Sequence, residues 1–271
     1  MTPSHPPFTD MPSAQLIFTS MQVVILALIM AFLARDCFRQ RNWMPFTLLA
    51  GGVIALLQEP VVDIAGLIWY PPNGAWAIMH VDGRVVPWLC LFGYVWLYPG
   101  LGAIVYIMIR NGASRTDIWK FWIGLMVFLM VGVEFYGSGT GVYHYYGDQP
   151  LKLFDYSVYW GFINASSTVL TGALAWALRK HLTGWRTVFA VAVAPLAVGA
   201  SFFGGGGVTF VALNSGPLPW YVTQLAGLLT CAICSIGVWM VLRAVPAQRS
   251  AASAKDLLSS APVSEPVAAV R

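Results

Sequence analysis

The chain has 271 residues, of which 58% are hydrophobic and only 10% are charged. A typical soluble domain carries about 25% charged residues, so the composition excludes an ordinary water-soluble protein and predicts that lipid forms part of the solvent. The formal net charge of +4 does not indicate binding to nucleic acid, and the distribution of the charges is more informative than their sum.

Seven mainly apolar runs are long enough to cross a bilayer, which takes about 20 residues. We predict an all-α, polytopic membrane bundle with helices at about residues 15–34, 45–69, 86–109, 118–136, 157–178, 186–212 and 219–243. Together they are expected to form one transmembrane domain, residues 15–244. A short extracytoplasmic segment, 1–14, precedes it, and a disordered cytoplasmic tail rich in Ala, Ser and Pro, 245–271, follows it.

The sixth run contains four consecutive glycines, residues 204–207. Each glycine loses extra backbone entropy when it is ordered. We therefore expect this helix to end near Phe203 and to leave a flexible or re-entrant segment.

Lysine and arginine alternate between the two sides of the predicted spans. One side receives Arg35, Arg39, Arg41, Arg110, Arg115, Lys120, Arg179, Lys180, Arg186, Arg243, Arg249, Lys255 and Arg271. The other side receives only Arg84 and Lys152. Because cytoplasmic loops are enriched in Lys and Arg, we predict a multi-pass protein of the cell membrane with its N-terminus outside and its C-terminus in the cytoplasm.

Three acidic residues lie inside the apolar runs. Glu59 and Asp63 are four residues apart and share one face of the second helix, and Glu134 lies near the outer end of the fourth. A charge at the bilayer centre costs about 2.5–3.5 kcal/mol even on the most lenient scale. These side chains are therefore expected to face the protein interior, to pair or to hold a proton, and they are our candidate catalytic residues.

Other polar residues fall at the same depth as the three acids. Asn164 on the fifth helix and Gln224 on the seventh are both in the outer half, and Tyr98 precedes Pro99 on the third. Proline frees backbone groups that cavity water or neighbouring helices can satisfy. This shared level predicts a polar cavity that opens to the non-cytoplasmic side.

The outer loops add aromatic and polar side chains that could bind a substrate above the acids. The candidates are Trp69, Asn73, His80, Tyr136 and His144. An aromatic belt at the membrane boundary is the alternative interpretation of each tryptophan and tyrosine.

Several classes of membrane protein lack their defining residues here. The seventh run contains no lysine, so a retinal Schiff base is excluded, and the chain has no glycine-rich phosphate loop. Cys231 and Cys234 are spaced like a redox motif but lie within an apolar helix, where cysteine behaves as a small hydrophobe. We expect no metal and no organic cofactor.

Six short motifs together resemble the AveC-like spirocyclase family of bacterial membrane proteins, over roughly residues 40–240. They are Glu59-Pro60-Val61-Val62-Asp63, Trp69-Tyr70-Pro71, Val86-Pro87-Trp88 with Tyr98-Pro99, Glu134-Phe135-Tyr136, and Tyr143-His144-Tyr145-Tyr146-Gly147. The resemblance implies stereoselective formation of a spiroketal from a dihydroxy-ketone polyketide. The chain has a weaker resemblance to integral-membrane terpene cyclases.

The sequence thus favours a cofactor-independent, acid–base cyclase that acts on a lipophilic small molecule taken from the bilayer. In this hypothesis Glu59, Asp63 and Glu134 share the acid and base roles, which stay unassigned. A proton-coupled transporter is the first alternative, because carriers also use intramembrane carboxyls, and a non-catalytic membrane scaffold or receptor is the second. The sequence predicts no oligomeric state.

Overall fold

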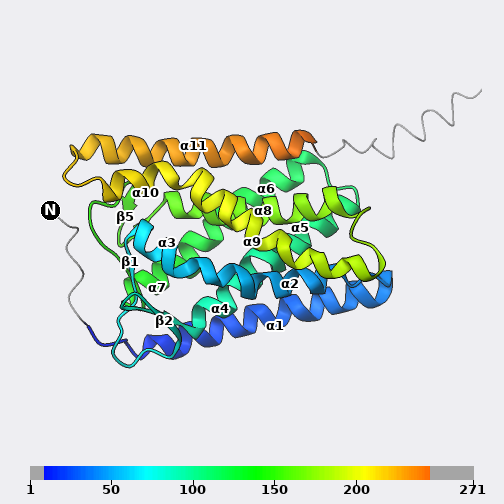
Figure 1. Cartoon of the computed structure of the whole chain (residues 1–271), viewed down its shortest axis with the longest axis horizontal. Helices are drawn as coiled ribbons and strands as arrows, with labels where there is room; N and C mark the ends of the chain where they lie inside the picture. The colour runs from blue at the N-terminus through cyan, green and yellow to red at the C-terminus, as the bar shows by residue number, and fades with distance from the viewer. Residues whose placement is uncertain (1–8, 245–271) are drawn as a thin grey trace, which may run out of the picture.

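The computed structural model describes residues 9–244, which form a bundle of long, roughly parallel and antiparallel helices (Figure 1). Seven helical stretches are long and apolar enough to cross a membrane: Ala14–Gln40, Met44–Gly66, Trp88–Arg110, Arg115–Gly139, Tyr159–Leu178, Gly184–Gly205 and Trp220–Ala244. The predicted all-α bundle is confirmed, with seven helical stretches that could each span a membrane by their length and composition. The predicted tail, 245–271, and the first eight residues of the predicted N-terminal segment lie outside the described residues.

Four of the seven spans are built from shorter pieces, and α1 (Ala14–Gln40), α8 (Tyr159–Leu178) and α11 (Trp220–Ala244) are continuous α-helices. The second span is α2 (Met44–Ala55), the 3₁₀ turn η1 (Leu56–Gln58) and α3 (Glu59–Gly66). The third is α4 (Trp88–Val95), the π-helical segment η2 (Trp96–Gly100) and α5 (Leu101–Arg110). The fourth is α6 (Arg115–Phe128), the π-helical segment η3 (Leu129–Glu134) and α7 (Phe135–Gly139). The sixth is the 3₁₀ helix η4 (Gly184–Ala192), α9 (Val193–Gly199) and the π-helical segment η5 (Ala200–Gly205), and α10 (Gly207–Asn214) follows it.

Three antiparallel two-stranded sheets lie together at one end of the bundle, which we call the strand end (Figure 1). They pair β1 (Ile68–Trp69) with β4 (His144–Tyr145), β2 (Ala77–Val81) with β3 (Arg84–Pro87), and β5 (Lys152–Leu153) with β6 (Tyr156–Ser157). The opposite end, which we call the basic end, holds the turns that follow Gln40, Arg110 and Leu178 and the last residue of α11.

The predicted second helix, 45–69, is too long at its C-terminal end. The helix ends at Gly66, because Leu67 adopts a left-handed conformation with φ 54° while its N–H still bonds to the carbonyl of Asp63. The next two residues then extend and pair with β4. Trp69 therefore lies on a strand and not on a helix.

The chain stays helical through most of the glycine run, and the two middle glycines are closely packed. The sixth span continues to Gly205 and α10 begins at Gly207. The predicted single helix 186–212 is therefore two successive helical stretches. A Cβ on Gly205 would lie 2.8 Å from the Sγ of Cys234, and one on Gly206 would lie 2.5 Å from the carbonyl oxygen of Phe202. Glycine is needed here because neighbouring atoms leave no room for a side chain.

A second close contact joins α5 to α8. A Cβ on Gly172 of α8 would lie 2.6 Å from the Cβ of Val105 on α5, and one on Gly102 of α5 would lie 2.8 Å from the Cγ2 of Thr171. Such small residues let helix backbones pack tightly where lipid supplies no hydrophobic driving force.

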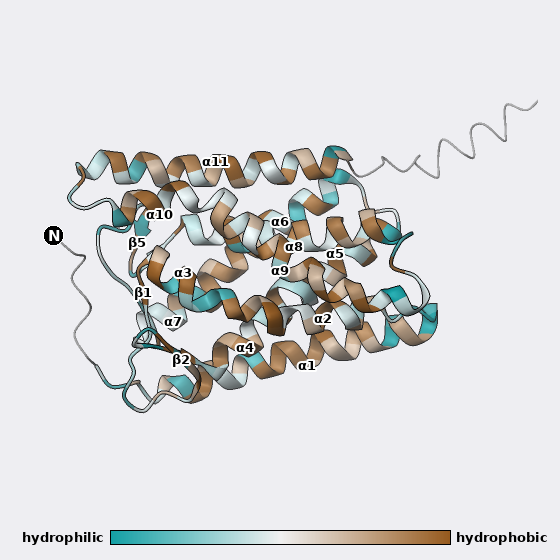
Figure 2. Ribbon diagram, in the orientation of Figure 1, coloured by the Kyte–Doolittle hydropathy of each residue, from teal (hydrophilic) through white to brown (hydrophobic). Residues whose placement is uncertain are grey.

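The surface follows the pattern expected for lipid contact. Large apolar side chains are exposed along α1 and α11, among them Leu16, Leu28, Leu225 and Met240. Figure 2 shows hydrophobic residues along the helices and hydrophilic residues gathered near the turns at both ends of the bundle. Near the basic end an ion pair joins α1 to α5, where Arg110 lies 2.6 Å from Asp36.

Candidate functional site

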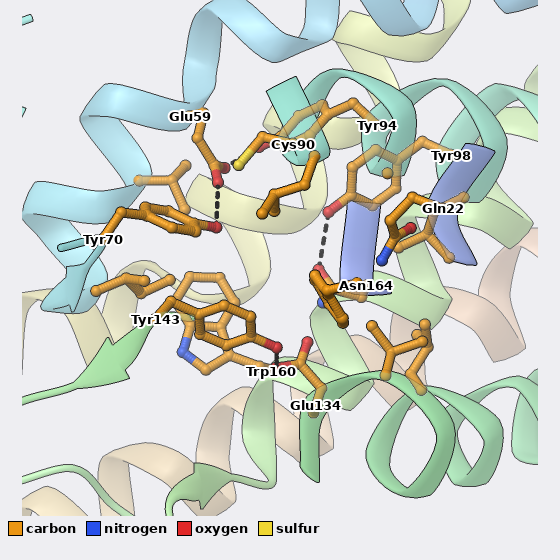
Figure 3. A pocket seen from close by; sticks show the side chains of 18 of the residues that line it. Gln22, Glu59, Tyr70, Cys90, Tyr94, Tyr98, Glu134, Tyr143, Trp160 and Asn164 are labelled. Atoms are coloured by element: carbon orange, nitrogen blue, oxygen red, sulfur yellow. Dashed lines mark hydrogen bonds between the residues drawn. The ribbon is translucent and has the colours of Figure 1, made fainter. Parts of the chain in front are cut away.

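A polar cavity lies inside the bundle, toward the strand end. Its volume is about 110 Å³, and side chains from the first six spans and from the strand-end segments line it. The residues that carry its chemistry are Gln22, Glu59, Tyr70, Cys90, Tyr94, Tyr98, Glu134, Tyr143, Tyr145 and Asn164. Figure 3 shows Glu59 and Glu134 on opposite sides of this space.

Glu59 is held by two phenols. It is 7% exposed and begins α3, directly after the 3₁₀ turn η1. The hydroxyl of Tyr94 donates to its Oε2 at 2.7 Å, and the hydroxyl of Tyr70 donates to its Oε1 at 3.1 Å. The Cys90 side chain lies beside the same carboxyl (Figure 3). Both carboxyl oxygens thus have a fixed donor, which stabilises a negative charge on this group.

Glu134 is held by a second pair of phenols, but in a different way. The hydroxyls of Tyr143 and Tyr145 both donate to its Oε2, at 2.7 Å and 2.8 Å. Its Oε1 accepts no hydrogen bond from any described residue, and the carboxyl points into the cavity (Figure 3). One oxygen is therefore fixed and the other is free to contact a bound molecule.

The phenols on Glu134 stay protonated at ordinary pH. Burial, followed by the charge of Glu134, raises the pKa of Tyr143 and of Tyr145 well above the usual value for tyrosine. Their O–H groups therefore remain donors to the carboxyl across the physiological range.

A third polar pair lies on the wall of the same cavity. The hydroxyl of Tyr98 donates to the Oδ1 of Asn164 at 3.0 Å, which joins the third span to α8. Tyr98 also packs edge-on against Tyr94, with ring centroids 4.8 Å apart. The pair places an amide group in the cavity wall, where it could orient substrate oxygens.

Three π-helical segments deliver side chains to this cavity. Trp96 and Tyr98 come from η2, Glu134 from η3, and Phe202 from η5. A π-helical turn widens the helix locally and occurs frequently at functional sites. In η2 the distortion surrounds Pro99, which has no N–H to donate.

Four of the predicted site residues, Glu59, Glu134, Tyr98 and Asn164, line the cavity together. Asp63 does not line it, although it is one turn from Glu59 and only 1% exposed. Neither oxygen of Asp63 has a hydrogen-bond partner among residues 9–244. Its proposed catalytic role therefore finds no support in the geometry.

The other predicted binding residues lie away from the cavity. Gln224 accepts a bond from the backbone N–H of Leu151 at 2.9 Å, and Tyr136 stacks on Phe18 at 5.9 Å between ring centroids. Asn73 is exposed in a loop at the strand end, and His80 is exposed on β2. Their positions favour structural or surface roles.

Trp69 and His144 occupy facing positions of the β1–β4 ladder. Trp69 is buried in a small apolar cluster with Leu67, Tyr146 and Leu213, apart from the main core. Neither residue is among those that line the cavity.

Arg84 is buried, not a loop charge facing water. It is 8% exposed, and it donates to the carbonyl of Ile68 and, at 2.6 Å, to the hydroxyl of Tyr146. Its guanidinium also lies 5.6 Å from the centre of the Trp69 ring. Arg84 thus ties β3 to β1 and to the end of β4, next to Ile68, which lines the cavity.

Gln149 also joins several segments near the strand end. Its amide nitrogen donates to the carbonyls of Gly66 and Tyr146 at 2.8 Å and 3.0 Å, and its Oε1 accepts from the hydroxyls of Ser157 and Tyr159. One buried side chain therefore holds the end of α3, the loop after β4 and the start of α8.

The sequence analysis missed the residues that position the two carboxyls. Tyr94, which donates to Glu59, lies four residues before the predicted Tyr98 and shares its face of the third span. Tyr143 and Tyr145, which donate to Glu134, are two residues apart, the spacing that puts side chains on one side of an extended segment. Gln22 on α1, which is 3% exposed, accepts a bond from the Nε1 of Trp96. A buried glutamine within an apolar span was the signal for a polar interior on that face.

No protein-family model, curated protein or solved structure matches this chain, so its function is inferred from its own residues. In the described part of the chain, no three His, Cys, Asp or Glu side chains come together as a metal site would require.

Proposed function

We propose that the protein is an integral-membrane cyclase that closes rings in a lipophilic, polyketide-like or terpene-like substrate by acid–base catalysis. Spiroketal formation from a dihydroxy-ketone is the reaction class that the residues fit best. The observation that carries the proposal is the cavity in which Glu59 and Glu134 face each other, each held by two tyrosine hydroxyls.

The proposed reaction needs one proton donor and one proton acceptor. In the first step a substrate hydroxyl adds to the ketone carbon, the base takes the hydroxyl proton and the acid protonates the carbonyl oxygen, which gives a hemiketal. In the second step the roles reverse: the group that took the first proton protonates the hemiketal hydroxyl, which leaves as water, and the second hydroxyl attacks and loses its proton to the group that donated in the first step. The sum is one spiroketal and one water from one dihydroxy-ketone.

The hydrogen bonds differ between the two carboxyls and support different roles. Glu59 accepts bonds on both oxygens, which favours its charged form and makes it the better candidate for a fixed negative charge or base. Glu134 has one oxygen without a bond from the described residues, so we assign it the direct exchange of protons with the substrate.

The cavity volume limits what can react inside it. About 110 Å³ is somewhat smaller than the roughly 150 Å³ engineered cavity that binds benzene. The cavity thus accommodates the ring-forming part of a substrate, and the remainder of a longer chain would extend out of it. Phe18 of α1 lines the cavity and stacks on Tyr136 of α7. We therefore propose that the remainder of the substrate lies between α1 and the fourth span.

The membrane and the orientation are part of the proposal. The turns at the basic end and the last turn of α11 carry the Lys and Arg excess, and the strand end carries Arg84, which is buried, and Lys152. By the rule that cytoplasmic loops are basic, we place the N-terminus outside, the C-terminus in the cytoplasm and the cavity in the outer half of the cell membrane.

The test is turnover of synthetic dihydroxy-ketones by the full-length protein in proteoliposomes, with chiral separation of the spiroketals. We expect Glu134→Gln to lower the rate by about 10²–10⁴-fold, which is the usual contribution of a positioned acid or base. Asp63→Asn is the matched control, because Asp63 is a buried carboxyl outside the cavity. A racemic product from the wild type, or an equal rate in Glu134→Gln, would refute the cyclase.

A proton-coupled transporter remains the second candidate, because the three π-helical segments surround the carboxyls. Such segments can supply the broken helices that carriers use at a central site. Counterflow of a labelled substrate into proteoliposomes, lost in Glu134→Gln and without chemical change of the substrate, would favour transport.

A further inference from the structure

Two hollows meet at the basic end, far from the carboxyl cavity. The first is an apolar groove of about 480 Å³ between α8, α9 and α11. Small side chains on α8, on α9 and at the start of η5 leave the space open: Ala173, Ala177, Ala197 and Ala200. Elsewhere in the bundle small residues bring helices into contact, but here they border an unfilled groove.

The second hollow is a polar pocket of about 500 Å³ beside the groove. The turn between α1 and α2 contributes Arg41 and Asn42, and Thr183 and Thr187 come from the start of the sixth span. Arg179, at the end of α8, borders both hollows. The two spaces therefore share one cationic residue at their junction.

The basic side chains of this pocket have no acidic partner among residues 9–244. Of the acids at the basic end, Asp36 binds Arg110 at 2.6 Å and Asp117 binds the capping Ser114. Within residues 9–244, no carboxylate lies within ion-pair distance of Arg41 or Arg179.

Arg179 is held in place by its own helix. It donates to the carbonyl of Trp176 at 2.7 Å, and its guanidinium lies 3.5 Å from the centre of the Trp176 ring. The charge is thus fixed at the mouth of the groove, while Arg41 is exposed on the far wall of the polar pocket.

We propose that the groove and the pocket form one binding site for an anionic phospholipid. The phosphate lies between Arg41 and Arg179, and one acyl chain lies along the alanine-lined groove. From Leu170 to the capping Arg179 the groove follows α8 for nine helical rises, about 14 Å, which is close to half of the roughly 30 Å hydrocarbon core. A basic pocket between helices joined to an apolar groove of one-leaflet length matches both parts of such a lipid.

The test uses the full-length protein in detergent and measures binding of phosphatidylglycerol and phosphatidylcholine of the same chains by native mass spectrometry. Each arginine is expected to contribute about fivefold to the preference for the anionic lipid. Arg179→Gln and Arg41→Gln should each lower the preference by that factor, and the double variant should remove it. Arg179→Lys should retain most of it, and Lys120→Gln, which changes a basic residue outside both hollows, should leave it unchanged.

Filling the groove tests the acyl-chain half of the site. Ala197→Leu should weaken the binding of both lipids by a similar factor, since the change removes space and not charge. Equal binding of the two lipids by the wild type would overturn the proposal. So would equal competition by glycerol phosphate, which would show a phosphate site without a chain site. A dimer that Ala197→Leu converts to monomer, with lipid binding unchanged, would show that a second copy covers the groove instead.

Discussion

Glu59 and Glu134 come from different spans, yet each carboxyl accepts two phenolic hydrogen bonds at the wall of the same cavity. The two sites are not equivalent. The phenols of Glu59 divide between its two oxygens, whereas both phenols of Glu134 donate to one oxygen. Tyr143 and Tyr145 therefore depend on the same oxygen of Glu134.

Removing both phenols from Glu134 should cost more stability than the sum of the single changes. In Tyr143→Phe or Tyr145→Phe the Oε2 keeps one donor, and each change is expected to cost about 1–2 kcal/mol. The double variant leaves that buried oxygen without its donors. Thermal unfolding in detergent would measure the coupling. Tyr136→Phe serves as a control, because no hydrogen bond of its hydroxyl is found within residues 9–244, and strict additivity would contradict the shared-oxygen geometry.

Asp63 should be dispensable for folding. Its oxygens are buried and have no partner in the described part of the chain, so Asp63→Leu replaces an unsatisfied polar group with an apolar one of similar size. We expect stabilisation by about 1–3 kcal/mol. Glu59→Gln should instead destabilise, because an amide nitrogen cannot accept the phenolic bonds. A lower Tm for Asp63→Leu would mean that Asp63 has a stabilising partner in the membrane.

Gly172 should not tolerate a side chain. A Cβ there would lie 2.6 Å from the Cβ of Val105, so Gly172→Ala is expected to separate α5 from α8 and cost about 1–3 kcal/mol. Gly124→Ala is the matched control on α6. Nothing lies within 4 Å of its added Cβ, and the change should gain about 0.5–1 kcal/mol from backbone entropy. A comparison of the two melting temperatures checks this contact.

Acidification should destabilise the strand end through His144. Burial lowers the pKa of His144 below its usual 6.5, and Asp155 opposes this only in part. The unfolded chain therefore binds more protons than the folded chain at pH values just below 6.5, and stability falls as the pH decreases through that window. Melting temperatures between pH 5 and 8 should show a smaller loss in His144→Asn, which cannot titrate there. Identical profiles of melting temperature against pH for the wild type and His144→Asn would show that His144 does not cause the loss of stability.

The positions of the spans follow from hydropathy, but their ends do not. The first predicted helix, 15–34, stops where Arg35 and Asp36 begin, yet α1 continues to Gln40. Charged residues mark the limit of the apolar region, and the helix continues past it because backbone hydrogen bonds do not depend on hydropathy. The left-handed Leu67 has no sequence signal of its own, because glycine is the residue usually expected there.

The carboxyls of the site were predictable and their partners were not. A charged residue in an apolar run is conspicuous, so Glu59 and Glu134 could be found from the sequence alone. Tyr70 and Tyr143 belong to loops whose aromatic residues fit a membrane boundary equally well. Arg84 directly follows the Asp82-Gly83 turn of a short hairpin, so its burial depends on contacts with Ile68 and Tyr146 that local sequence does not encode.

The π-helical segment Leu129–Glu134 makes the site sensitive to a change that leaves composition intact. Each residue of an α-helix turns the chain by about 100°. Deleting a single apolar residue such as Val131 would keep the fourth span long and hydrophobic. The same deletion would rotate Glu134 and everything after it relative to α6. Among homologues, a one-residue gap at this point would therefore separate chains that share the membrane architecture from chains that share the chemistry.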